Sequence, residues 1–253
     1  NVWGHIGGGL NNKNYGHKGL IGGGVDNYIV RDAHTVIGSG TKNYIYSYVA
    51  HIGGGSLNTV QGDYASVGGG YFCNAYGSYS TVGGGNLNRA YGTGTTVHSG
   101  SGNFVGSSYN AIGGGTVNYA YSSYGIISGG TSNTIKGGHA TISGGYLNKA
   151  LSTYTGIQGG HSNSAMSIKT NIGGGYSNYV SAYATVVVGG NDNYAIGYHS
   201  TIGGGADNYV KGSYAQVFGG IDNSVLVSYA TVSGGESNIA ATAHSIVSGG
   251  YVG

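Results

Sequence analysis

Hydrophobic residues recur along this chain at one fixed spacing. An Ile or Val opens the repeats at positions 6, 21, 37, 52, 67, 82, 97, 112, 127, 142, 157, 172, 187, 202, 217, 232 and 247. Fifteen of the sixteen intervals between these positions equal fifteen, and only the interval from Ile21 to Ile37 is sixteen. Repetition at one short period predicts a solenoid, in which each repeat buries its apolar residues against its neighbours.

The other constrained positions of the repeat are small. If the Ile or Val is position 1, position 4 is Gly in all 17 copies and position 3 is Gly in all but two. Position 9 is a small apolar residue in 15 of 16 copies, such as Val60 or Ala90, and position 14 is mostly Ala, Ser, Thr or Gly. β-Branched residues favour strands and glycines permit sharp corners, so the repeat indicates short strands around a very thin core.

These patterns predict the fold of the whole chain. We expect an all-β protein, a parallel β-solenoid of about 15 residues per turn and about 17 turns, built as a thin β-roll or a narrow triangular β-helix. No break in the repeat divides the sequence, so residues 1–253 are interpreted as a single solenoid domain. The chain begins and ends within the repeat, which is typical of a processed product or a fragment.

Position 7 is Asn in 15 of 16 copies, and Cys73 is the exception. Asn tolerates the left-handed region and bonds to nearby backbone, so it suits a turn. Stacked amides also bond to one another as a ladder. We therefore predict a structural ladder made of Asn12, Asn27, Asn43, Asn58, Asn88, Asn103, Asn118, Asn133, Asn148, Asn163, Asn178, Asn193, Asn208, Asn223 and Asn238.

Composition excludes several classes of protein. Charged residues make up 6% of the chain and the net charge is +2, and the nine Lys and Arg are scattered, so we expect no nucleic-acid partner. No apolar run approaches the roughly 20 residues that span a membrane, so we expect no membrane insertion. Gly is abundant but Pro is absent, which excludes collagen. The single Cys73 excludes an internal disulfide framework.

Tyr is the abundant large side chain, with 25 copies that favour positions 8 and 13. Because they recur at the same place in successive repeats, such rings are predicted to form rows along the outside of the solenoid. They stiffen the repeat, pack neighbouring chains together, or bind a glycan or receptor. The residues assigned to this outer face are Tyr64, Tyr79, Tyr109, Tyr124, Tyr179, Tyr194, Tyr209, Tyr214 and Tyr229.

Residues suited to catalysis or metal binding are sparse. Asp192, Asp207 and Asp222 share position 6 in three consecutive repeats, where a solvated acidic ridge competes with a weaker interpretation as a cation site. The nine His residues lie at different positions without metal-ligand spacing. No repeat is marked as special, so we expect no catalytic residues, no bound cofactor, no metal site beyond that weak candidate and no enzymatic activity.

One copy of the repeat resembles a known family of surface proteins. It reads Ala230-Thr231-Val232-Ser233-Gly234-Gly235-Glu236-Ser237-Asn238-Ile239-Ala240. This stretch resembles the head repeats of YadA-like trimeric autotransporter adhesins, and Gly-Gly-Gly-x-x-Asn arrays look like those of phage tail-fibre and bacterial surface proteins. The resemblance implies a left-handed parallel β-roll that trimerises along a fibre. This repeat departs from the adhesin pattern by being one residue longer and by its regular Gly triplet.

Uniform repetition, low charge and outer Tyr rows predict a structural component of an extracellular fibre or filament. Such a protein assembles with copies of itself through backbone ladders and Tyr-rich faces, and it is extracellular, at the cell surface or part of a virion fibre. The alternative is an adhesin or phage tail-fibre shaft that binds surface glycans or receptors. An ice-binding solenoid is a remote alternative, because Thr81, Thr96, Thr141, Thr201 and Thr231 share position 15 but other residues interrupt the row.

Overall fold

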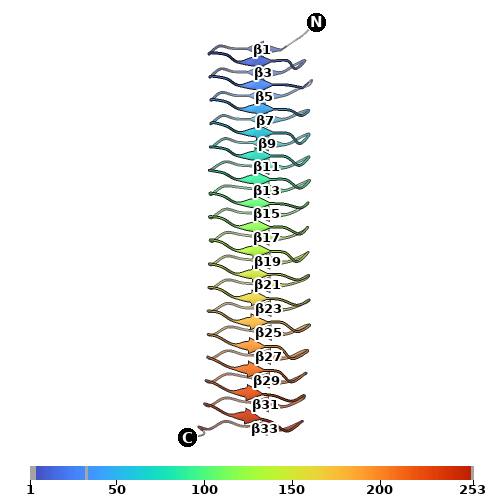
Figure 1. Ribbon diagram of the computed structural model, residues 1–253, viewed down its shortest axis with the longest axis vertical. Helices are drawn as coiled ribbons and strands as arrows, with labels where there is room; N and C mark the ends of the chain where they lie inside the picture. The colour runs from blue at the N-terminus through green and yellow to red at the C-terminus, as the bar shows by residue number, and fades with distance from the viewer. Residues whose placement is uncertain (1–3, 32–33, 252–253) are drawn as a thin grey trace. The chain divides into compact units, whose positions relative to one another are not determined.

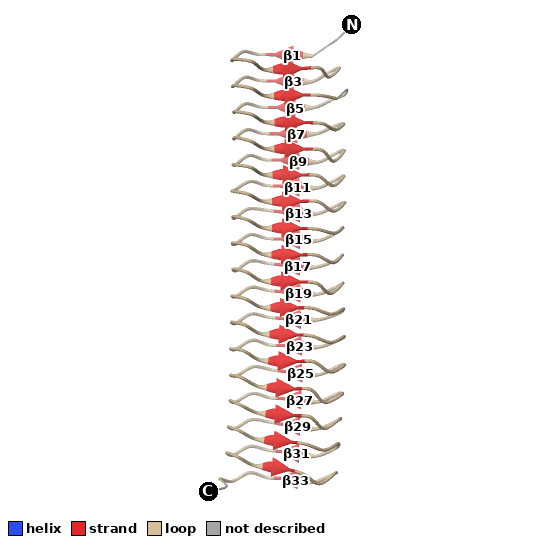
Figure 2. Cartoon of the chain, viewed as in Figure 1, coloured by secondary structure: helices blue, strands red, loops and turns tan. Residues whose placement is uncertain are grey.

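The computed structural model describes residues 4–31 and 34–251, which fall into two compact units divided between Gly130 and Thr131. Each unit is a parallel β-solenoid, and the described residues contain strands, turns and bends but no helix. One circuit of the repeat, here called a coil, contributes two strands of two residues each. Positions 15 and 1 form one strand and positions 8 and 9 form the other, so each unit has a first sheet and a second sheet (Figures 1 and 2).

The strands of the first unit are short and regularly spaced. Its first sheet contains β1 (His5–Ile6), β3 (Leu20–Ile21), β5 (Val36–Ile37), β7 (His51–Ile52), β9 (Ser66–Val67), β11 (Thr81–Val82), β13 (Thr96–Val97), β15 (Ala111–Ile112) and β17 (Ile126–Ile127). Its second sheet contains β2 (Lys13–Asn14), β4 (Tyr28–Ile29), β6 (Tyr44–Ile45), β8 (Thr59–Val60), β10 (Asn74–Ala75), β12 (Arg89–Ala90), β14 (Phe104–Val105) and β16 (Tyr119–Ala120).

The second unit repeats the same plan. Its first sheet contains β19 (Thr141–Ile142), β21 (Gly156–Ile157), β23 (Asn171–Ile172), β25 (Val186–Val187), β27 (Thr201–Ile202), β29 (Gln216–Val217), β31 (Thr231–Val232) and β33 (Ile246–Val247). Its second sheet contains β18 (Thr134–Ile135), β20 (Lys149–Ala150), β22 (Ser164–Ala165), β24 (Tyr179–Val180), β26 (Tyr194–Ala195), β28 (Tyr209–Val210), β30 (Ser224–Val225) and β32 (Ile239–Ala240).

Equivalent residues of successive coils lie beside one another within each unit. Ile172 pairs with Val187 in the first sheet, and Val180 pairs with Ala195 in the second, both in parallel register. The predicted all-β parallel solenoid, with one repeat of the sequence in each turn, is therefore confirmed. We expected either a thin β-roll or a narrow triangular β-helix. The coil is a thin β-roll, because it has two sheets rather than three. Eight second-sheet strands lie in each unit, so about 16 turns are present where we expected about 17.

The core of each coil is as thin as its sequence. The Ile or Val at position 1 and the small residue at position 9 are fully buried in nearly every coil, as Ile172 and Val180 illustrate. Position 14 adds a third buried group such as Ala140 or Thr170, and the Asn at position 7 adds a fourth. The interior therefore combines apolar packing with a buried polar column, which requires hydrogen-bond partners for every amide.

Two turn positions in every coil have left-handed backbone. Positions 6 and 13 have positive φ in each described coil, for example 51° at Asp192 and 60° at Tyr229. The Asn residues at position 7, which we expected to suit the left-handed conformation, do not adopt it. The preceding residue reverses the chain instead, and the Asn side chain points into the interior. This difference arises because a buried amide gains several hydrogen bonds that an exposed turn would not provide.

The single longer interval of the repeat falls in one turn and leaves both sheets in register. Six residues separate Ile29 from Val36, where the next coil has five between Ile45 and His51. The pairs Leu20 with Val36 and Ile21 with Ile37 remain parallel neighbours across it. The turn that contains positions 10–14 therefore absorbs an extra residue without disturbing the strands.

Candidate functional site

The predicted Asn residues form a hydrogen-bonded column within each unit. In the second unit, the backbone N–H of Asn193 and its Nδ2 donate to Oδ1 of Asn178 at 3.1 and 3.0 Å. The same Nδ2 lies 3.1 Å from the carbonyl oxygen of Gly189 in its own coil and 3.0 Å from that of Gly205 in the next. Each amide thus links three neighbouring coils, which is the arrangement of a structural ladder.

The column extends through most of both units. Asn27 donates to Asn12 in the first unit and Asn238 donates to Asn223 in the second, with Nδ2–Oδ1 distances of 3.1 and 3.0 Å. All the described members from Asn27 to Asn238 are buried. These residues are held by backbone and by each other, so they stabilise the fold.

Cys73 interrupts the column in the first unit. Its backbone N–H still donates to Oδ1 of Asn58 at 2.8 Å, while its thiol Sγ lies 3.5 Å from the carbonyl oxygen of Gly85. Burial raises the pKa of the Cys73 thiol, although hydrogen bonds between the thiol and the backbone of Asn88 and Tyr71 act in the opposite direction. A buried, protonated thiol is a poor nucleophile, so this residue carries no chemistry in the folded protein.

The Tyr residues at position 13 form rows of parallel rings on one edge of each unit. The centroids of Tyr64 and Tyr79 are 5.0 Å apart with an angle of 4° between the rings. Tyr109 and Tyr124 are 5.3 Å apart at 11°, and the side chain of Tyr79 is 61% exposed. In the second unit the row contains His199, Tyr214, Tyr229 and His244, at spacings of 4.9–5.2 Å. The rings are stacked along the solenoid axis, so their edges and hydroxyl groups are what solvent meets.

The Tyr residues at position 8 are less uniform. Tyr179 and Tyr194 stack with centroids 4.5 Å apart, and Tyr194 is a register neighbour of Tyr209. Tyr194 is exposed, whereas Tyr179 and Tyr209 are half-buried. This part of the predicted outer face is therefore a short ladder on the second sheet.

A larger aromatic group in the first unit was not identified in the sequence. Tyr76, Tyr91, Phe104, Tyr119 and Tyr121, here called the aromatic patch, contact one another with centroid separations of 4.6–6.3 Å. They come from positions 8 and 10, which point to the same outer side of the second sheet. A comparison of positions 8 and 10 together, rather than singly, would have found this patch.

The acidic row does not gather metal ligands. Asp192, Asp207 and Asp222 are exposed at left-handed turn positions, with φ between 51° and 56°. Asp222 Oδ2 accepts a hydrogen bond of 3.2 Å from the hydroxyl of Ser237 in the following coil. Within residues 4–31 and 34–251, no group of three His, Cys, Asp or Glu side chains is placed to hold a metal ion. Asp is common in left-handed turns, which accounts for these residues structurally.

The first sheet presents a different outer surface, made of the side chains at position 15, which vary from Ser and Thr to His and Ile. Thr81 and Thr96 are parallel neighbours there, and the row continues with Ala111 and Ile126. In the first unit, position 15 therefore has only this pair of adjacent threonines, whereas an ice-binding surface needs a long row of them.

Comparisons with known proteins leave the chain unassigned to a family. Over the part of the chain that the structure describes, no helix has the length and apolar character to cross a membrane. No protein-family model matches the sequence, and no curated protein matches it significantly.

Proposed function

We propose that this protein is a structural component of an extracellular or cell-surface fibre, in which copies of the chain associate side by side through the Tyr rows at position 13. The observation that carries this proposal is the spacing of 4.9–5.3 Å between rings of adjacent coils, in runs that Gly94 interrupts in the first unit and Lys169 and Ala184 interrupt in the second. A second copy of the chain has the same ring spacing, so its Tyr row can contact the Tyr row of the first copy in successive coils. A partner protein without this spacing would align with the row only by chance.

The chemistry of the exposed edge supports the same proposal. Tyr64, Tyr79 and Tyr109 are each more than half exposed, and they present both an apolar ring edge and a hydroxyl group. Tyr is enriched at interfaces that are partly hydrated, because it contributes apolar area and a hydrogen bond together. The net charge of +2 provides little repulsion between copies.

The ring geometry favours assembly over glycan binding by these rows. Sugars pack against the faces of aromatic rings. In the position 13 rows those faces cover each other, at interplanar angles of 2–15°. Only edges and hydroxyl groups remain for a partner, and an identical row provides the complementary edge.

A charge-substitution experiment tests the proposal. Tyr64, Tyr79, Tyr109 and Tyr124 are changed together to Lys, which already occupies position 13 at Lys18 and Lys169 with φ of 59°. The matched control places four Lys on the first sheet of the same unit, at Thr81, Thr96, Ala111 and Ile126. Electron microscopy and light scattering then compare the two variants with the unmodified chain.

We expect filaments or bundles from the unmodified chain and from the control, and dispersed particles from the Tyr variant. A monodisperse monomer of the unmodified chain at high concentration would refute the fibre proposal itself. Loss of assembly in the control alone would instead place the interface on the first sheet. Circular dichroism of all three proteins establishes that each remains folded.

A further inference from the structure

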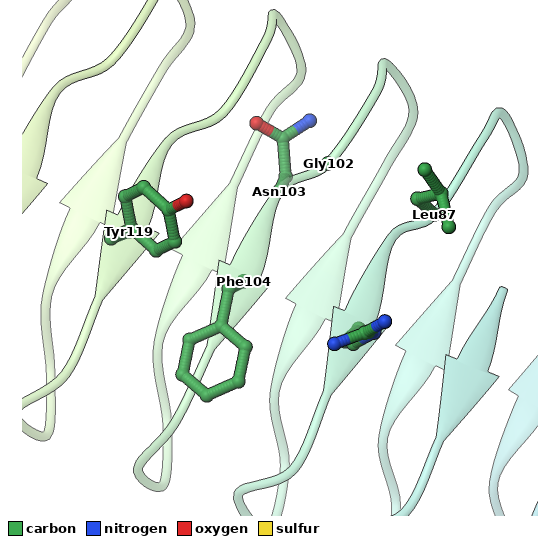
Figure 3. Close-up of a pocket in the computed structure, with 6 residues that line it drawn as sticks. Leu87, Gly102, Asn103, Phe104 and Tyr119 are labelled. Atoms are coloured by element: carbon green, nitrogen blue, oxygen red, sulfur yellow. The ribbon is translucent and has the colours of Figure 1, made fainter.

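The first unit has a depression on its second sheet beside Gly102, which occupies position 6 of its coil and has no side chain. Gly102 is the only Gly among the position 6 residues, and it lies between Leu87 and Val117 of the neighbouring coils. The depression has a volume of about 210 Å³ and is lined by Leu87, Arg89, Gly102, Asn103, Phe104 and Tyr119 (Figure 3). A Cβ atom on Gly102 would contact only Val117, at 3.4 Å or more, so space rather than backbone contact surrounds this glycine.

Arg89 gives this depression a positive charge that no carboxylate of the neighbouring coils neutralises. Its Nε is buried and has no hydrogen-bond partner, and its guanidinium carbon lies 5.8 Å from the ring centroid of Phe72. The chain has no Asp or Glu anywhere between Tyr64 and Asn191, so the neighbouring coils provide no carboxylate to Arg89. A buried donor on a charged group costs free energy unless it is paired, so this residue is suited to receive an anionic group from outside.

Two aromatic rings and one aliphatic side chain provide most of the remaining lining, beside Asn103 and Gly102. The rings of Phe104 and Tyr119 have centroids 6.3 Å apart and planes tilted by 47°, and Figure 3 shows both on the same side of the sheet. Leu87 closes the side beyond Gly102. The volume is below the range of about 300–1,000 Å³ that is typical of pockets for drug-sized ligands, so it suits a single ring.

We propose that this depression binds a carboxylate carried on one six-membered ring. The carboxylate pairs with the guanidinium of Arg89, whose planar fork of donors matches two carboxylate oxygens. The ring packs against Phe104, Tyr119 and Leu87 in the space that Gly102 leaves open. Two sources provide this chemistry, an aromatic acid and a sugar acid, and benzoate and glucuronate serve as their probes.

The composition of the chain provides a specific measurement. Arg89 is one of only two arginines, so the full chain labelled with ¹⁵N-arginine gives two Nε signals, and Arg31 serves as the internal control. Titration with benzoate or glucuronate is expected to shift the Arg89 signal saturably while Arg31 stays unchanged. Benzamide and glucose are the neutral counterparts, and we expect each to bind at least tenfold more weakly than the corresponding acid.

Two variants locate the binding. Gly102→Leu fills the depression with the residue found at the same position in the preceding coil, Leu87, so the fold tolerates it. We expect at least a tenfold loss of affinity in Gly102→Leu and in Arg89→Gln, the latter followed by isothermal calorimetry. Saturation by benzoate alone identifies an aromatic acid, and saturation by glucuronate alone identifies a sugar acid. The proposal is overturned if neither acid shifts Arg89, if the neutral compounds bind equally well, or if folded Gly102→Leu binds as the unmodified chain does.

Discussion

At the scale of single residues, the glycine at position 4 is the most constrained in the coil. Gly190 has φ of 92°, and a Cβ atom there would overlap the carbonyl oxygen of Gly205 in the next coil. It would also lie 2.7 Å from Nδ2 of Asn193, which belongs to the ladder. By contrast, a Cβ atom on Gly189 meets nothing within 4 Å. The structure therefore requires a glycine at Gly190, whereas it has space for a Cβ atom at the adjacent Gly189.

Gly190→Ala and Gly189→Ala separate these reasons. We expect Gly190→Ala to lower the free energy of unfolding by about 3 kcal/mol, because it combines backbone strain with a clash between coils. Gly189→Ala is expected to be neutral or to stabilise by up to about 1 kcal/mol, through the reduced entropy of the unfolded chain. Urea unfolding followed by circular dichroism measures both. Equal losses in the two variants would contradict this explanation.

Cys73 tests the energetic contribution of the Asn column. Cys73→Asn replaces a weak sulfur acceptor with an amide oxygen facing the backbone N–H of Asn88. We expect a gain of about 1 kcal/mol in the free energy of unfolding, the usual net value of one hydrogen bond. The converse change, Asn178→Cys in the uninterrupted part of the column, is the matched control and is expected to lose stability. A gain in both variants would show that the column does not stabilise the fold.

The buried thiol also predicts a dependence on pH. Burial raises the pKa of Cys73, so in the folded protein it stays protonated at pH values where an ordinary cysteine, with a pKa of about 8.5, has begun to ionise. The unfolded chain ionises first as the pH rises, so this residue contributes stability below that value and loses it above. We expect a thiol-specific disulfide reagent at about pH 8.5 to react slowly with the folded chain and fast in urea. Equal rates would mean that the thiol is accessible.

At the scale of elements, the two turns of a coil differ in their tolerance of length. The turn of positions 10–14 contains an extra residue between Ile29 and Val36, and the register survives. The glycine turn holds the ladder, in which Asn193 is bonded to both neighbouring coils, and a row of single bridges such as Tyr176 with Asn191.

A single inserted serine measures that difference. Between Tyr183 and Ala184 it lies in the tolerant turn, and we expect a loss of about 1 kcal/mol or less in the free energy of unfolding. Between Gly189 and Gly190 it displaces the ladder, and the loss is expected to exceed about 3 kcal/mol, since several buried groups lose their partners. Thermal unfolding of the two insertion variants compares them directly. Equal tolerance at both sites would contradict the assignment of the ladder as the fixed part of the coil.

The sequence predicted some parts of the element and not others. Positions 1, 9 and 14 were identified as interior because a β-branched or small residue recurs there, and Ile172, Val180 and Ala140 are buried as that requires. The left-handed positions 6 and 13 were not identified, because they hold Tyr, Leu and Lys as well as Asp. Local preference for that backbone is weaker than the hydrogen bonding of the coil, so residue type does not reveal it. The depression at Gly102 depends on neighbours from three coils and has no signature in any one repeat.

At the scale of the whole molecule, association is expected to depend on aromatic contacts rather than on charge. Only 6% of the residues are charged, and most of the residues in the exposed position 13 rows are Tyr or His. We expect assemblies formed at about 50 mM NaCl to persist at about 500 mM, because screening weakens exposed ionic contacts and leaves apolar ones intact. Light scattering across this range is the measurement. Dissociation in salt would indicate an ionic interface and would count against the Tyr rows.

The buried amide column has a further consequence for how the protein ages. Deamidation requires the side chain of Asn to swing onto the backbone nitrogen of the following residue. At Asn193 that nitrogen, from Tyr194, is already bonded to the carbonyl oxygen of Asn208 at 2.8 Å, while the Asn193 amide is fixed by its own partners. Asn is one of the least chemically stable residues in proteins. In this protein, the Asn residues of the column are protected from deamidation. Asn86 and Asn191 also precede a bonded backbone nitrogen, but their side chains are exposed rather than buried in the column, so old samples should lose amide nitrogen there first.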